Sequence, residues 1–108
     1  MKYWVYLACA ILLEVAGTTS MKLSKGFTNI VASVFLFVFY AVSFVALTFA
    51  LKKIDIAVAY AIWSGIGTAL IATVGILYFR EPATLLRLVS IGFIIAGVAG
   101  LHLSQANH

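Results

Sequence analysis

Four apolar stretches, each about twenty residues long and separated by short polar connections, constrain this chain more than any other feature. A helix needs about 20 residues to cross the hydrocarbon core of a bilayer. The stretches predict four transmembrane helices at residues 3–21, 29–51, 56–79 and 85–103. The sequence therefore predicts an all-α integral membrane protein in which residues 1–108 form a single transmembrane domain.

The composition agrees with this fold class. Hydrophobic residues make up 65% of the chain and charged residues 9%, whereas soluble domains are typically about 45–50% apolar and about 25% charged. With Cys9 as its only cysteine, the chain has neither a disulfide scaffold nor a Cys-based metal site, and we expect no metal. Most of the formal net charge of +4 lies in the connections, which indicates contact with membrane lipids rather than with nucleic acid.

The distribution of Lys and Arg gives almost no instruction about orientation. Short connections rich in these residues stay in the cytoplasm. The side with both termini and the second connection carries Lys2, Lys52 and Lys53. The opposite side carries Lys22, Lys25, Arg80 and Arg87. We therefore expect the chain to insert both ways up and two copies to pair as an antiparallel, dual-topology homodimer. The alternative is one topology, set by other features.

Small residues recur along the predicted fourth helix. They are Gly92, Ala96 and Gly100 at four-residue intervals, and Ser90 and Gly97 seven residues apart. Small side chains let helices approach closely in lipid. The pattern favours this helix as the dimer contact, and the alternative is that it packs within the monomer.

Glu14 is the residue that an apolar helix explains least. It lies about 3 Å along the axis from the centre of the first predicted helix, with no basic residue within seven positions. An ionised carboxylate at that depth costs several kcal/mol, so carboxylates in spans usually mark ion or proton pathways. Its neighbours on the helix are mostly small or flexible and leave space around it: Leu7, Ala10, Ile11, Gly17, Thr18 and Met21.

Aromatic and hydroxyl side chains occupy similar depths in the other helices. Tyr40 lies near the centre of the second helix with Ser43 one turn on. Trp63 lies about 7 Å from the centre of the third, flanked by Tyr60 and Ser64. Aromatic faces attract desolvated cations by up to about 2 kcal/mol, so these groups and Glu14 together indicate a site for an organic cation. For a single deep Trp, packing is the alternative.

Gly65 and Gly67 come two and four residues after Trp63. Paired small residues often mark a kink in a helix, and a flexing third helix could open the site to either side in turn. The alternative is close packing of a neighbouring helix against glycine.

Two stretches, "LLEVAGTTSMKLSKGF" and "AYAIWSGIGT", resemble the small multidrug resistance family over essentially the whole chain. The resemblance implies an antiparallel homodimer in the bacterial inner membrane that exports hydrophobic or quaternary ammonium cations, with protons as the coupling ion and no other cofactor. It implies that Glu14 binds protons or substrate and that Gly65 and Gly67 form a kink. The substrate-binding residues that we expect are Ala10, Ile11, Gly17, Thr18, Tyr40, Ser43, Tyr60, Trp63 and Ser64.

Two branches of that family differ in substrate. Gly17-Thr18-Thr19 resembles the branch that exports bulky quaternary and polyaromatic cations, and small residues there leave room for large ligands. The stretch "FREPATLLRLVSIGF" is more similar to the guanidinium exporters. Ser90 stands where the multidrug branch often has Gly, and Asp55 where a Pro is common.

The alternatives to a transporter are a membrane subunit and an enzyme. A membrane subunit that transports nothing stays open as an alternative. An enzyme is not expected, because no His, Cys or second acid converges on Glu14. We expect His102 and His108, at the end of the chain, to be exposed surface residues.

Overall fold

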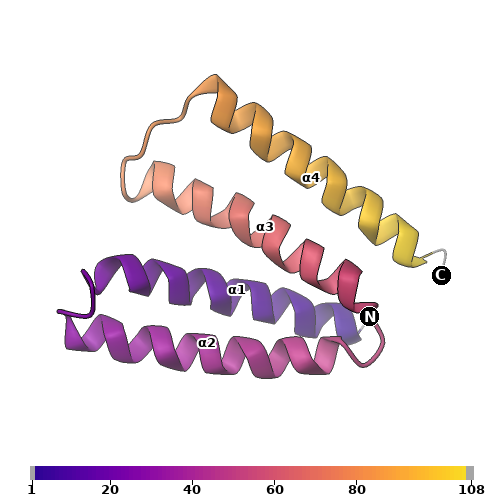
Figure 1. Cartoon of the computed structure of the whole chain (residues 1–108), viewed down its shortest axis with the longest axis horizontal. Coiled ribbons are helices and arrows are strands. Elements are labelled where there is room, and N and C mark those ends of the chain that lie inside the picture. Colours follow the sequence, from indigo (N-terminus) through magenta and orange to yellow (C-terminus); the bar gives the residue numbers. More distant parts are fainter. Residues whose placement is uncertain (1, 107–108) are drawn as a thin grey trace. The chain divides into compact units, whose positions relative to one another are not determined.

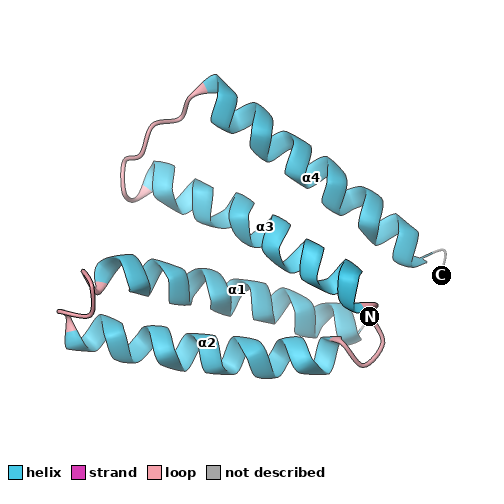
Figure 2. Ribbon diagram, viewed as in Figure 1, coloured by secondary structure: helices cyan, strands magenta, loops and turns pink. Residues whose placement is uncertain are grey.

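The computed structural model describes residues 2–106, which form four α-helices joined by loops (Figures 1 and 2). They are α1 (Lys2–Leu23), α2 (Ile30–Ala50), α3 (Ile56–Leu77) and α4 (Leu85–Ala106). All four are long and apolar enough to cross a membrane. The prediction of four transmembrane helices is confirmed, with each boundary within a few residues of its expected place. His102 is exposed, as expected, and His108 lies outside the described residues.

The chain divides into two compact units, one of α1 and α2 up to Lys53 and one of α3 and α4 from Ile54 onward. In the α1–α2 unit the buried residues are mainly aliphatic or small, among them Leu7, Ala10, Leu36 and Ala50. The fully buried Ser43 hydroxyl donates a hydrogen bond of 2.7 Å to the carbonyl oxygen of Ala10. Since no water reaches such a hydroxyl in an apolar setting, this bond fixes the register of the two helices.

A tight loop joins α1 to α2. The buried Ser24 hydroxyl donates to the carbonyl of Met21 (2.7 Å) and accepts from the amide of Phe27 (3.2 Å). Asn29 then caps α2, because its side-chain oxygen accepts a hydrogen bond of 3.1 Å from the amide of Ala32. These local bonds return the chain antiparallel to α1 and bring the middle of α2 beside the middle of α1.

Helices α3 and α4 meet at Gly65. A Cβ atom at that position would lie 2.7 Å from Cγ2 of Val98 and 3.2 Å from Cγ2 of Ile94. Near the C-terminal end of α4, Oε1 of Gln105 accepts a hydrogen bond of 3.1 Å from the amide of Asp55. Close packing against glycine, the alternative that the sequence left open, therefore describes Gly65. The α-helix continues through Gly65 and the buried Gly67, and the kink stays a prediction.

The outer surface of α4 is open. None of the residues in its membrane-spanning window is buried. A Cβ atom added at Gly92, Gly97 or Gly100 would meet no atom within 4 Å, and Ser90 and Ala96 are also exposed. Ser90 lines a pocket of the α3–α4 unit. A dimer contact on α4 is consistent with this surface and remains a prediction.

The contact at Gly65 gives a first prediction. The β-branched Val98 side chain cannot move aside easily, so Gly65→Ala should lower the free energy of unfolding by about 1–3 kcal/mol. Gly92→Ala is the matched control, because its new methyl group meets open space. Reversible unfolding by SDS from a monomeric detergent state measures both, and equal losses would contradict the packing described.

Candidate functional site

Glu14 lies near the middle of α1 and is half-buried. Its nearest polar partner is one turn further along the same face, where the Thr18 hydroxyl donates a hydrogen bond of 2.9 Å to Oε1 of Glu14. A spacing of four residues places the two side chains beside each other on a helix. Among residues 2–106, the carboxylate is therefore held by a hydroxyl group and not by a cation.

Tyr40 of α2 extends this arrangement. Its phenol oxygen lies 2.6 Å from the hydroxyl oxygen of Thr18, and either atom could be the donor. We call the three linked residues the Tyr40–Thr18–Glu14 chain. The sequence predicted all three as site residues, but it did not predict their bonds. A Thr four residues after a Glu was the signal that could have suggested the first one.

The Tyr40 ring is positioned by its packing. A Cβ atom at Gly17 would lie 3.2 Å from Cδ1 and from Cε1 of Tyr40, so the ring rests on the bare backbone of α1. On its own helix it stacks with Phe44, with ring centroids 6.3 Å apart and planes at 15°. The space left by glycine at position 17 is therefore filled by Tyr40. The expectation that this small residue makes room for a large ligand loses its support.

Three other predicted residues pack within the helix pair. Ala10 and Ser43 are fully buried and share the hydrogen bond described above. Ile11 is 5% exposed. Their contacts account for why small and aliphatic residues stand at these positions, and a role in substrate binding stays a prediction for each.

A second group of predicted residues lies on α3. The rings of Tyr60 and Trp63 are in contact, with centroids 5.6 Å apart and planes at 58°. Tyr60 is 60% exposed, so much of its surface is not covered by the described residues. The Ser64 hydroxyl donates to the carbonyl of Tyr60 at 2.7 Å. This bond uses its proton and leaves only oxygen lone pairs for other partners.

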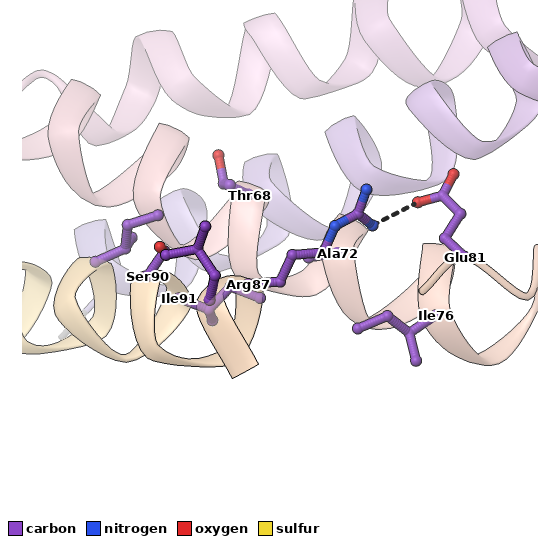
Figure 3. A pocket seen from close by; sticks show the side chains of 9 residues that line it. Thr68, Ala72, Ile76, Glu81, Arg87, Ser90 and Ile91 are labelled. Carbon is purple, nitrogen blue, oxygen red and sulfur yellow. Dashed lines mark ion pairs between the residues drawn. The ribbon is translucent and has the colours of Figure 1, made fainter. Parts of the chain in front are cut away.

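The α3–α4 unit contains a pocket that the sequence did not predict. Figure 3 shows Glu81 and Arg87 pointing toward each other there, with 3.8 Å between the nearest nitrogen and oxygen. Both side chains are well exposed, so the ion pair contributes little stability. The Glu81 carboxylate also lies against Gly75. The available signal was the stretch "FREPATLLRLVSIGF", which supplies both charged residues and Ser90, another residue of the pocket lining.

A metal site finds no support in these side chains. Within the described range, no three of the His, Cys, Asp and Glu side chains gather closely enough to hold a metal ion.

Comparison with known proteins shows the family of this chain. The family described as Small Multidrug Resistance protein matches residues 2–94. The chain belongs to the small multidrug resistance family. With its four long apolar helices, it is accordingly a multi-pass protein of the bacterial inner membrane.

Three relatives illustrate this similarity. The membrane protein YvaE of Bacillus subtilis is 55% identical, over 94% of this chain and 86% of its own. The multidrug resistance protein EbrB of the same organism is 45% identical, over 99% and 92%. A guanidinium exporter of Yersinia pseudotuberculosis is 40% identical, over 94% and 98%. Relatives named for different substrates thus lie at similar distances from this chain.

The contact between Gly17 and Tyr40 gives a second prediction. In Gly17→Ala the new methyl group presses on the ring and weakens the bond from Tyr40 to Thr18. Loss of one hydrogen bond of about 0.5–1.5 kcal/mol should lower cation affinity about 2–10-fold. Equilibrium binding to the purified protein should show a similar loss for tetramethylammonium and for tetraphenylphosphonium. A loss confined to the larger cation would show instead that Gly17 makes room for substrate.

Proposed function

We propose that this chain is a proton-coupled antiporter that exports hydrophobic and quaternary ammonium cations, with Glu14 holding a proton and a cation in turn. One observation carries the proposal. A carboxylate near the middle of a transmembrane helix is bonded to the Thr18 hydroxyl and makes no ion pair among the described residues, so its counter-charge is exchangeable. Family membership supports transport as the activity.

The proposed mechanism is exclusion. Placing an ionised carboxylate at the centre of a transmembrane helix costs about 2.5–3.5 kcal/mol, and either a proton or a cation removes that cost. The site with neither is the least stable state, so an arriving cation displaces protons and arriving protons displace the cation. Inward proton flow then drives cation export.

The aromatic residues give this exchange its preference for organic cations. A quaternary ammonium ion has no N–H group to donate, and it is bound mainly by ring faces and by charge. The Tyr60–Trp63 pair on α3 offers such faces. We assign cation contact to these rings and charge compensation to Glu14.

The working unit in this proposal is an antiparallel homodimer. Groups near mid-depth meet their own counterparts when two copies are related by a two-fold axis in the membrane plane, and transporters often place their sites there. The nearly even distribution of Lys and Arg and the open surface of α4 support this arrangement. Two Glu14 carboxylates would then share one site.

Export of guanidinium is the second candidate. It is favoured by the 40% identity to a guanidinium exporter and by the stretch "FREPATLLRLVSIGF". A guanidinium ion is planar and carries N–H donors, so it would bind through the oxygens of the Tyr40–Thr18–Glu14 chain more than through ring faces.

Replacement of Glu14 gives a third prediction. Glu14→Gln should abolish proton release on addition of tetraphenylphosphonium, because the amide has no exchangeable charge. Glu14→Asp should keep cation binding and release its protons at a lower pH. A pH-sensitive dye in weakly buffered detergent solution measures the release.

The matched control is Glu81→Gln, the same chemical change in an exposed ion pair beyond the end of α3. This variant should release protons as the unmodified protein does. Cation-driven proton release from Glu14→Gln, or its loss from Glu81→Gln, would contradict the assignment of Glu14.

A substrate panel in proteoliposomes gives a fourth prediction. With a pH gradient as the only driving force and no partner protein present, we expect uptake of tetramethylammonium and of the polyaromatic cation ethidium. Uptake of guanidinium alone would favour the second candidate. Uptake of none of the three would favour a membrane subunit that transports nothing.

A further inference from the structure

The Thr18 hydroxyl lies between two groups and has one proton to give. It is 2.9 Å from Oε1 of Glu14 and 2.6 Å from the phenol oxygen of Tyr40. An ionised carboxylate only accepts hydrogen bonds, and a Thr hydroxyl donates one. When Glu14 is ionised, Thr18 therefore donates to Glu14, and Tyr40 must donate to Thr18. The phenol proton then points into the helix pair, and the outward side of its oxygen carries lone pairs.

Protonation of Glu14 at Oε1 reverses this order. The carboxylic acid becomes the donor, Thr18 accepts from it, and the Thr18 proton turns to the phenol oxygen of Tyr40. The phenol O–H group of Tyr40 no longer donates to Thr18, so it rotates until its proton points away from the helix pair. One proton is added to Glu14 and no other O–H bond breaks, because the two hydroxyl groups only rotate.

The packing around the Tyr40–Thr18–Glu14 chain favours rotation of its hydroxyl groups over movement of whole side chains. The Tyr40 ring is held between Gly17 and Phe44. Glu14 and Thr18 lie on consecutive turns of the same helix. In Ile30–Ala50, Tyr40 itself is the single titratable residue facing α1. The titratable residues of α1 besides Glu14 are Lys2, Tyr3, Tyr6, Cys9 and Lys22.

We propose that Thr18 is a positioning residue that transmits the protonation state of Glu14 to the hydroxyl group of Tyr40. This inference rests on the proposed exchange at Glu14. With Glu14 ionised, Tyr40 presents lone pairs to a bound cation. With Glu14 protonated, Tyr40 presents a positively polarised O–H group. Two groups thus change together from attracting a cation to repelling it, so a single proton excludes the cation more strongly than neutralisation of Glu14 alone.

Carbon-13 NMR of the purified full chain tests this inference. Labels are placed at the carboxyl carbon of glutamate and at the phenol carbon of tyrosine. The Glu14 signal is identified by its loss in Glu14→Gln, and the Tyr40 signal by its loss in Tyr40→Phe. In the unmodified protein, we expect the Tyr40 signal to shift in one step, at the pH at which Glu14 titrates.

Two variants separate transmission from simple proximity. Thr18→Val keeps the branched shape and removes the hydroxyl, so Glu14 should still titrate while the Tyr40 step is lost. Thr18→Ser keeps the hydroxyl and should keep the step. A Tyr40 step that persists in Thr18→Val, or is absent from the unmodified protein while Glu14 titrates, would overturn the inference and leave the proposed function intact. Failure of the proposed function has a different readout. If tetraphenylphosphonium is added at a pH at which Glu14 is protonated and the carboxyl signal of Glu14 does not shift, the proposed exchange is wrong.

Discussion

The Glu14 carboxylate in an apolar helix pair is the constraint on which the account of this protein depends. A charge at that depth must be compensated, and within the described chain the polar group that reaches it is the Thr18 hydroxyl. A hydroxyl orients a carboxylate without neutralising it. In the proposed function the charge is left to a mobile species, a proton or a cation, and Glu14 exchanges one for the other.

Close helix packing supplies the geometry around this carboxylate. Glycine at position 17 brings the Tyr40 ring onto the backbone of α1, and the bond from Ser43 to Ala10 fixes the register that places the phenol beside Thr18. In lipid, helices associate through close contact and hydrogen bonds, since apolar burial gives little preference between neighbours. The small residues near Glu14 thus allow α1 and α2 to pack closely, and this packing positions the Tyr40–Thr18–Glu14 chain.

The sequence predicted the four helices well, because twenty-residue apolar runs with charged connections leave few alternatives. It also predicted Glu14, Thr18 and Tyr40 as site residues. It could not assign partners to Gly17 or Ser43, since helices that are apolar on every face carry no periodic signal for which face meets which neighbour. For the same reason the packing of Gly65 against Val98 and the pocket beside Glu81 were visible only in the structure.

The dissociation constant of tetraphenylphosphonium as a function of pH tests the central claim, mutual exclusion at Glu14, most directly. Two ligands that exclude each other must weaken each other equally. Below the pH at which Glu14 takes up its proton, the dissociation constant should rise about tenfold for each unit that the pH falls and for each proton displaced. Above that pH the dissociation constant should not change. A dissociation constant that does not change with pH across the titration of Glu14 would contradict the account.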